Sequence, residues 1–438
     1  MKRNLRFAPP SGSVADAMAL CLTPEIEALT ARFTGRDLSL FRSDMDGSDQ
    51  RLHQAIGGKR ILMIGAAGSI GSATLFELIA YGPAAVTVMD TSENNLAELI
   101  RTLRSMGTPF EGEFNVEPLD YGSPLAASFL AETMPFDLVL SFAALKHVRS
   151  ERDSRSLLRM LEVNLVKADR FLGALRLHGH GNDGVFLVST DKAADPINLM
   201  GASKRAMESL LWFHGTPGNP ATLLDGGEAP ALNRVTTARF ANVAFSDGSL
   251  PWAFLRRLEK GQPLAAPEKV RRYFVSLEEA GQLCLLTATL CPGSHVMVPK
   301  MEPERDGFSF VEIAHAVLEQ HGLEPKVFRN EAKARLAVAE CLEEGTYPLL
   351  LTAADTSGEK LMETFVALDE ETSSVGLESF WGIAGQGTPD EDLATLLRMV
   401  DDACRGSDQP AMETLVAAIN ACVPALDHAE GKSLDDRM

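Results

Sequence analysis

The sequence has little of what marks cross-linked, membrane or nucleic-acid-binding proteins. Only 6 of its 438 residues are cysteine, no two at CxxC spacing, and no cysteine–histidine group has zinc-ligand spacing. No apolar stretch reaches the roughly 18–20 residues of a membrane helix. Positive charge is also scarce, with a formal net charge of -19, whereas polyanion binders are usually basic. We therefore expect reduced thiols, no metal, a cytoplasmic location without membrane insertion, and no nucleic-acid partner.

Short apolar runs alternate with amphipathic segments from about residue 58 onwards. KRILMIG, AAVTVMD, FDLVLSFAAL and GVFLVST are expected strands, and the segments between them have the apolar spacing of helices. This alternation predicts βαβ units in an α/β fold, a Rossmann-type doubly wound parallel sheet. Ligands of such sheets bind at the carboxyl ends of the strands.

Three regularly spaced glycines follow the first expected strand. Gly65, Gly68 and Gly71, in GAAGSIG, open the next helix. The first permits a tight turn, the second lets the backbone approach a pyrophosphate, and the third allows close helix packing. The helix N-terminus adds free N–H groups and the positive end of its dipole. This strand–turn–helix context predicts a dinucleotide site, with a plain glycine-rich turn as the alternative.

Acidic residues follow the next two expected strands. Asp90 ends the second strand about 20 residues after the glycines, where an acid accepts hydrogen bonds from ribose hydroxyls and repels a 2′-phosphate. No arginine follows closely, which favours NAD over NADP as the cofactor. The alternative is that Asp90 caps the next turn. Asp120, in EPLDYGS, is either an adenine contact or a loop carboxylate.

A resemblance to a known family adds to these patterns. VSTDKAADPINLMGASKRAMESLL closely resembles the active-site segment of nucleotide-sugar 4,6-dehydratases of the polysaccharide-biosynthesis (CapD-like) branch of extended short-chain dehydrogenases/reductases. GAAGSIGSATLFELI, FAALKHV, RFANV, RRYFVSLEEA and GEKLMETF follow in that family's order and spacing. The resemblance covers residues 58–300 well, 300–370 weakly, and the two ends hardly at all. Met200 stands where most of the superfamily has tyrosine, and some members of this branch also carry methionine there.

The resemblance implies a dehydration in which NAD ends as it began. A hydride leaves C4 of the sugar, a base removes the C5 proton, an acid protonates the departing C6 hydroxyl, and the hydride returns to C6. The family's assignments make Lys192 the base and Asp191 the acid, with Thr190 on the C4 oxygen and Lys204 on the nicotinamide ribose. Met200 has no ionisable proton, so the C4 proton is expected to leave through water or Asp191.

The same resemblance places further binding residues around this group. The expected cofactor contacts are Gly65, Gly68, Ser69, Ile70, Gly71, Asp90, Ser92, Asp120, Tyr121, Ala143, Ala144, Asn164 and Lys204. The expected substrate contacts are Lys146, His147, Asn242, Arg272 and Glu359. His147 is alternatively a packed histidine, and Asn164, in mid-helix, is alternatively exposed.

The pattern departs from the family where substrate phosphates are expected. Asp247 replaces a cation of the family's SRGS loop, and Thr356-Ser357 replace an Arg-Pro pair before GEK. Arginines at 256, 257, 271 or 272 are candidates to compensate, and Arg272 fits the family best. These changes leave the nucleotide of the substrate open.

The expected organisation combines these regions. Residues 1–57 are a helical N-terminal extension, 58–245 the NAD-binding domain with 270–298 returning to it, 246–375 a substrate-binding region, and 376–438 a helical C-terminal extension. We expect a homo-oligomer that dehydrates a UDP-N-acetylhexosamine such as UDP-N-acetylglucosamine in glycan-precursor biosynthesis. The alternatives are a 4-epimerase or 4-reductase on the same scaffold, and a non-catalytic NAD-binding paralogue, which Met200 and Asp247 motivate.

Overall fold

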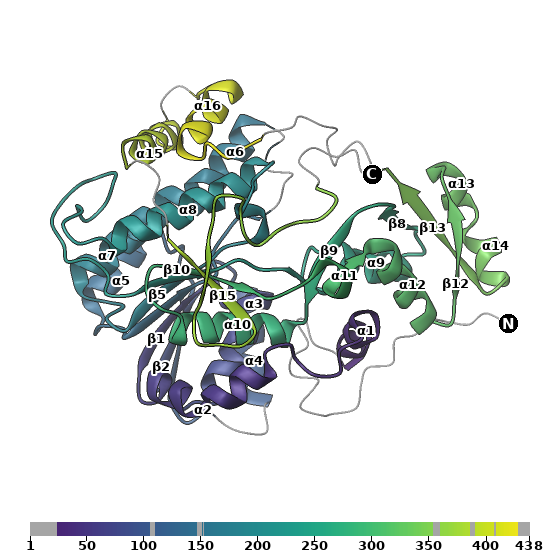
Figure 1. Ribbon diagram of the computed structural model, residues 1–438, viewed down its shortest axis with the longest axis horizontal. Coiled ribbons are helices and arrows are strands. Elements are labelled where there is room, and N and C mark those ends of the chain that lie inside the picture. Colours follow the sequence, from purple (N-terminus) through teal and green to yellow (C-terminus); the bar gives the residue numbers. More distant parts are fainter. Residues whose placement is uncertain are drawn as a thin grey trace.

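A large, mostly parallel sheet forms the centre of the molecule (Figure 1). The computed structural model describes residues 24–105, 110–146, 151, 153–353, 360–385, 390–406 and 409–427. The strand order is β14-β15-β10-β6-β5-β4-β1-β2-β3. The parallel strands are β1 (Arg60–Ile64), β2 (Ala85–Met89), β3 (Glu113–Glu117), β4 (Leu138–Ser141), β5 (Gly184–Val188), β6 (Val235–Ala238) and β10 (His295–Pro299).

The parallel part of the sheet confirms the expected fold class. The order β3-β2-β1-β4-β5-β6 is that of a Rossmann sheet, in which the strand order reverses between β1 and β4. Strands β2 and β5 are buried along their whole length, as sheets covered on both faces require. The carboxyl ends of β1, β4 and β5 therefore meet at one crevice, where the glycine loop and the Thr190–Lys192 segment emerge.

Helices cover both faces of this sheet. On one face α3 (Ser69–Ile79) packs against α10 (Leu277–Leu290), and α10 against α2 (Arg42–Ile56). The other face carries α5 (Pro124–Glu132), a rod of α6 (Ser154–Leu161), the π-helical turn η3 (Glu162–Val166) and α7 (Lys167–His178), and α8 (Leu199–Gly215). Helix α4 (Glu93–Ser105) links β2 to β3.

A smaller unit with its own apolar cluster lies beside the main sheet (Figure 1). It contains the sheets β11-β9-β7 and β12-β13-β8. Its strands are β7 (Asn242–Val243), β8 (Leu264–Pro267), β9 (Arg271–Val275), β11 (Gly307–Ser309), β12 (Glu324–Phe328) and β13 (Thr346–Thr352). Its helices are α9 (Leu250–Glu259), α11 (Pro303–Asp306), α12 (Phe310–Gln320), α13 (Glu331–Leu336) and α14 (Val338–Glu343).

The N-terminal helices connect the two units. Helix α1 (Pro24–Thr34) packs on α12, and its Phe33 ring meets Phe245, Phe274 and Phe308 edge-on. Helix α2 joins the main core, where Phe41 stacks on Phe380 with ring centroids 4.6 Å apart. The described part of the predicted helical extension, from residue 24 onwards, thus packs against both units.

The C-terminal region is helical, as predicted, but its helices follow two short strands. Strands β14 (Thr372–Ser374) and β15 (Phe380–Ala384) extend the large sheet, with β15 antiparallel to β10. Only then follow α15 (Asp390–Cys404) and α16 (Met412–Cys422), which pack on α6, η3 and α8 of the same chain (Figure 1). Leu396, Leu397 and Leu415 are completely buried there. This helical face is covered from within the chain, and the homo-oligomer stays a prediction.

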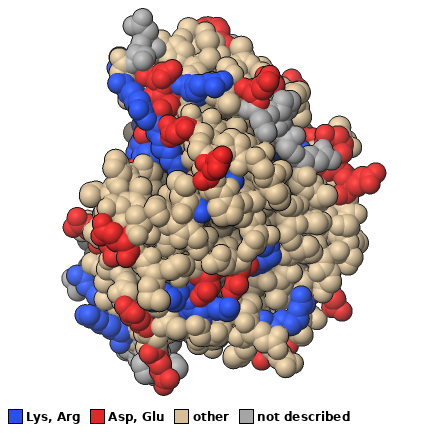
Figure 2. All heavy atoms as spheres, turned by 90° about the vertical axis from the view of Figure 1, so that its left-hand side faces the viewer, with Lys and Arg blue, Asp and Glu red and all other residues tan. Residues whose placement is uncertain are grey.

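Acidic and basic side chains lie close together on the described surface (Figure 2), and His180 is bonded to the backbone. On the face in Figure 2, acidic and basic side chains are interspersed in small groups among the described residues. Within those residues no helix has the length and apolar character of a membrane span, and no group of three His, Cys, Asp or Glu is arranged for a metal. His180 is buried, accepting from Phe136 N (3.1 Å) and bonding to Leu130 O (2.9 Å).

Candidate active site

The glycine loop after β1 has the geometry that its spacing predicts. Gly65 has a φ of +70°, and a Cβ there would lie 3.0 Å from the backbone nitrogen of Ala143. A Cβ on Gly71 would lie 2.5 Å from Ala66 Cα, so only glycine lets α3 pack this closely on the loop. Gly68, which precedes α3, meets nothing nearer than 3.5 Å and borders the open cavity. The first turn of α3 therefore presents backbone N–H groups to any anion in that space.

We expect Gly68→Thr and Gly71→Val to fail in different ways. Threonine is an acceptable N-cap, so Gly68→Thr should fold but weaken NAD binding about tenfold or more, since its side chain fills space that a pyrophosphate needs. Gly71→Val clashes with backbone and should lower the melting temperature before cofactor is added. Calorimetric titration with NAD and thermal unfolding without it measure the two effects. Unchanged NAD affinity in Gly68→Thr contradicts this loop as the cofactor site.

The carboxylate after β2 supports the loop directly. Asp90 accepts hydrogen bonds from Ala67 N (3.3 Å) and Ser92 N (2.9 Å). The second bond is the turn-capping role that the sequence left as an alternative, and the first ties Asp90 to the glycine loop. Asp90 is part-buried at the strand end, where a ribose would lie in this fold.

Asp120 and Tyr121, which follow β3, bond to other groups of the protein. Asp120 forms an ion pair with Lys167 and accepts from Gly122 N (3.1 Å). Burial alone would raise the pKa of Asp120, but these two partners lower it below its usual value. The buried Tyr121 hydroxyl donates to the carbonyl of Val163. The Tyr121 side chain therefore belongs to the core. Only the accessible surface of this turn is available to contact an adenine.

Asn164 fixes the loop that follows β4. It lies in η3 and is buried, which excludes the exposed alternative. Its side chain accepts from Leu145 N (2.9 Å) and donates to Leu145 O (3.0 Å) and Ser203 Oγ (3.1 Å). It thereby holds the 142–146 loop, which contains Ala143 and Ala144, against the sheet crevice. Asn164 therefore positions this loop and is not among the residues that line the cavity.

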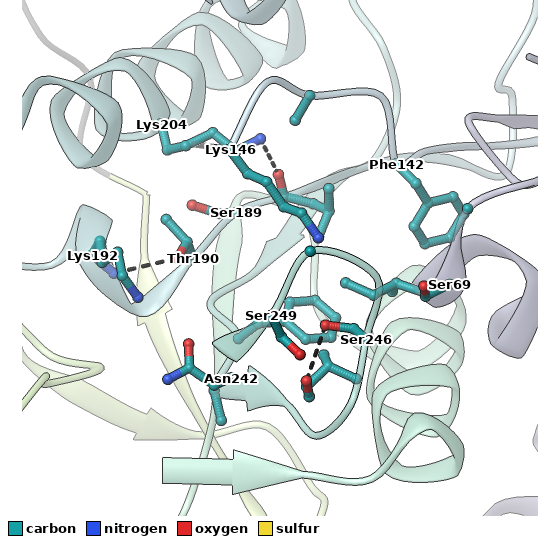
Figure 3. A pocket seen from close by; sticks show the side chains of 18 of the residues that line it. Ser69, Phe142, Lys146, Ser189, Thr190, Lys192, Lys204, Asn242, Ser246 and Ser249 are labelled. Atoms are coloured by element: carbon teal, nitrogen blue, oxygen red, sulfur yellow. Dashed lines mark hydrogen bonds between the residues drawn. The ribbon is translucent and has the colours of Figure 1, made fainter. Parts of the chain in front are cut away.

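The segment after β5 forms a compact acid–base group. In the 3₁₀ turn η4 (Asp191–Ala193), Asp191 Oδ1 accepts from Thr190 Oγ1 (3.0 Å) and Lys192 Nζ (2.8 Å). Asp191 is 1% exposed, and its Oδ2 has no hydrogen-bond partner among the described residues. A buried carboxylate oxygen without a hydrogen-bond partner destabilises the folded protein. A hydrogen bond from a ligand hydroxyl would be a physical reason to retain such an oxygen. Thr190 and Lys192 line the cavity (Figure 3), whereas Asp191 is not among the lining residues.

Helix α8 supplies the second lysine. Lys204 is buried, and its Nζ donates to the carbonyl of Val188 at 2.6 Å. Burial lowers the pKa of Lys204 to about 8, while Glu208 acts in the opposite direction. Met200 lies one turn earlier, is buried, and also lines the cavity. The tyrosine position thus presents a thioether beside Lys204, as the sequence implied.

These groups surround a cavity of about 370 Å³. Its far wall contains Asn242, the 246–249 loop and the start of α9 (Figure 3). The 246–249 loop contacts the opposite wall of the cavity. Asp247 N donates to Ser69 Oγ (3.4 Å), and Lys146 Nζ donates to Asp247 O (3.4 Å). The Asp247 side chain itself is exposed. The cavity is therefore bordered by the glycine loop, both lysines and a wall in which Asn242, Ser246 and Ser249 lie among apolar residues.

Among the described residues, the predicted substrate residue Arg272 does not line this cavity. Arg272 is buried and donates through Nη1 to the carbonyls of Arg271 and Lys360, both at 2.8 Å. Its other nitrogen lies 3.8 Å from Glu363. His147 and Glu359 fall outside the described residues. Arg272 thus points into a buried ionic cluster, which gives it a different immediate environment from the one expected.

Sequence reasoning missed two groups of buried charges next to the site. One is Glu363, inside the GEKLMETF motif, and the other joins Arg239 of RFANV to Glu208 and Glu370. Both motifs were recognised, but neither charge was assigned. Their signal was present only as charged residues inside otherwise apolar segments, and their partners lie far away in the sequence.

The sheet order, the glycine loop and the Thr190-Asp191-Lys192 and Met200–Lys204 groups define an extended short-chain dehydrogenase/reductase. Residues 61–383 match the family model described as "Polysaccharide biosynthesis protein", and the chain belongs to this family.

Named relatives agree with this membership. The chain is 26% identical to the probable polysaccharide biosynthesis protein EpsC of Bacillus subtilis and 27% to the capsular polysaccharide biosynthesis protein CapD of Staphylococcus aureus. Each match covers 56% of this chain and 38% of the relative, so the chain spans well under half of either. A UDP-N-acetylglucosamine 4,6-dehydratase (inverting) of Campylobacter jejuni is 25% identical over 59% of this chain and 71% of its own. The X-ray structure of Pen from Bacillus thuringiensis shares the fold, with a TM-score of 0.56 and 20% identity over 76% of this chain and 89% of that one.

Proposed function

We propose that the protein is an NAD-dependent nucleotide-sugar 4,6-dehydratase. The observation that carries the proposal is the Lys192–Asp191 pair: Lys192 lines the cavity beside Thr190, and its amine donates to the buried Asp191 at 2.8 Å. An elimination needs a base and an acid on neighbouring atoms, and this pair supplies both within one turn of chain. The unpartnered Oδ2 of Asp191 is the atom that would hold the leaving hydroxyl.

The residues fit a bound NAD at this place. The glycine loop and α3 would hold the pyrophosphate, Asp90 the adenosine ribose, and Lys204 the nicotinamide ribose. Bound NAD supplies a reversible hydride acceptor, so that the 4-ketone it makes possible acidifies the C5 proton. Thr190 would turn its hydroxyl from Asp191 to the C4 oxygen. The one proton that the Lys192–Asp191 pair shares would lie on Asp191 before elimination, so that Lys192 takes the C5 proton while Asp191 gives its own proton to the C6 oxygen, which departs as water.

The substrate we propose is a UDP-N-acetylhexosamine, with UDP-N-acetylglucosamine first. The Campylobacter jejuni relative named for that substrate supports this choice. The product would be a 4-keto-6-deoxy sugar nucleotide for polysaccharide assembly, which agrees with the family description. The exposed Asp247 side chain leaves the phosphate contacts to backbone groups and Lys146.

A 4-epimerase is the second candidate. Proteins named UDP-glucose 4-epimerase from Rickettsia match 23% of this chain, at 31–32% identity. Epimerisation also moves a hydride at C4, but it needs no acid at C6. The pairing of the buried Asp191 with Lys192 at the cavity therefore favours elimination.

Incubation with UDP-N-acetylglucosamine and NAD tests these candidates by mass spectrometry. We expect a product lighter by one water, without net NADH, because the hydride returns to the sugar. An isobaric hexosamine would instead support epimerisation. If UDP-, GDP- and TDP-sugars all return unchanged, the dehydratase proposal fails.

A further inference from the structure

A second buried carboxylate lies beside Lys192. The Glu363 side chain is 2% exposed, and its Oε1 lies 4.0 Å from Lys192 Nζ. Asp191 Oδ1 lies 2.8 Å from the same nitrogen. The amine is therefore flanked by two acids, one within hydrogen-bond length and one just beyond it.

The other charges facing Glu363 are fixed to the protein backbone. Arg272, from β9, lies 3.8 Å from Oε1, and its Nη1 donates to the carbonyl of Lys360. Lys360 lies 4.0 Å from Oε2 and donates to the carbonyl of Asp195. Of the three cations around Glu363, Lys192 lines the cavity. The cluster thus holds one carboxylate at a set distance from the amine that faces the substrate space.

The neighbours of Glu363 act on its ionisation in both directions. Burial raises the pKa of Glu363 above its usual value and Asp191 adds to this rise, while Lys192, Arg272 and Lys360 offset only part of it. The charge of Glu363 consequently depends on the state of the Lys192–Asp191 pair, and the dependence is mutual.

We propose that Glu363 is a positioning residue that sets the proton affinity of the Lys192 amine. This inference rests on the proposed dehydration. When Lys192 takes the C5 proton it becomes an ammonium ion, and Asp191 must at that stage carry the proton that it gives to the C6 oxygen. A protonated Asp191 is neutral, so Glu363 is then the anion that stabilises the new ammonium. The C5–H bond breaks toward Lys192, and the C6–O bond breaks as Asp191 releases its proton to water formation.

Glu363→Gln tests this role because it removes the charge and keeps the shape. A carboxylate at this distance shifts proton affinity by about one unit or more. We expect the pH at which Lys192 reacts with a small acylating reagent, followed by mass spectrometry of its peptide in the NAD-bound protein, to fall by about one unit. We expect kcat to fall about tenfold with KM little changed, because a weaker base acts on the same bound substrate. Glu371→Gln, an exposed acid on the same segment, is the matched control and should leave both values unchanged.

The outcomes separate this inference from the proposed function. A folded, NAD-binding Glu363→Gln protein whose Lys192 reacts at the wild-type pH overturns the inference, even if the wild type is a dehydratase. A shifted reactivity in a protein that dehydrates no nucleotide sugar upholds the electrostatic role and defeats the function. If Glu363→Gln does not fold, Glu363→Asp decides. Aspartate keeps the charge but holds it farther from Lys192, so we expect a smaller fall in the pH at which Lys192 reacts. An unchanged pH would overturn the role.

Discussion

Replacing Lys192 with methionine should lower kcat by about a thousandfold or more, within the range that general acid–base groups contribute. Lys192 lines the cavity and is the proposed base for the C5 proton. Methionine keeps the length and packing of the side chain but has no basic nitrogen. NAD should still bind, because the glycine loop and Asp90 are unchanged. Steady-state assays with UDP-N-acetylglucosamine and NAD titration measure the two quantities.

Two further variants give this prediction its controls. Lys260→Met removes an exposed lysine and should leave kcat at the wild-type level. Asp191→Asn should also stop dehydration but allow C5 hydrogen exchange in D₂O, since the base remains while the acid is lost. Lys192→Met should show neither exchange nor product. Retention of more than about a tenth of wild-type activity in Lys192→Met would exclude it as the base.

The second large effect is expected on stability, from Arg239→Met. Arg239 is completely buried and bonds to Glu208 Oε1 (3.0 Å) and Oε2 (2.8 Å), and to Glu370 Oε2 (2.6 Å). It also donates to the carbonyl of Phe365 (2.9 Å). Removing the guanidinium takes away the completely buried cation between Glu208 and Glu370 and leaves them with the part-buried Arg205. We expect the free energy of unfolding to fall by about 3–5 kcal/mol, as for other broken buried pairs.

Denaturant unfolding of the variant and a surface control measures this loss. Arg256→Met breaks an exposed pair with Glu259 (2.8 Å) and should cost less than about 1 kcal/mol. If both variants lose equally little, the buried network is not a stabilising centre. The network also reaches the site, because Ser189 next to Thr190 donates to Glu208 Oε1 at 2.6 Å.

The same network predicts acid sensitivity. Burial alone would raise the pKa of Glu370, but Arg239 and Arg205 lower it from 4.5 to about 2. A carboxyl whose pKa is lowered on folding stabilises the protein above its unfolded pKa. That contribution is present above pH 4.5 and is lost as the pH falls toward 2. In Arg239→Met the dependence of stability on pH in this window should be weaker.

Local sequence determined the nucleotide-binding half of the molecule. The β1–α3 boundary, the glycine spacing and Asp90 depend on contacts between neighbours in the chain, such as Asp90 with Ser92 N. Apolar runs of strand length between amphipathic helices leave few ways to bury both faces of a sheet. The position of the Thr190-Asp191-Lys192 segment was also predictable from local sequence, because the segment follows directly after the carboxyl end of a strand.

The tertiary structure alone decided which distant charges meet. Glu363 approaches Lys192, and Glu370 approaches Arg239, across more than a hundred residues, and no periodicity encodes such pairs. Strands β14 and β15 are short, and their place in the large sheet depends on backbone pairing with β10. Arg272 matched a substrate motif by sequence, yet burial directs it to Glu363 and backbone carbonyls. The sequence by itself thus determined the fold class, the glycine loop and the acid–base pair. The electrostatic setting of that pair came from long-range packing, because a buried charge is placed by whatever partner the fold brings to it.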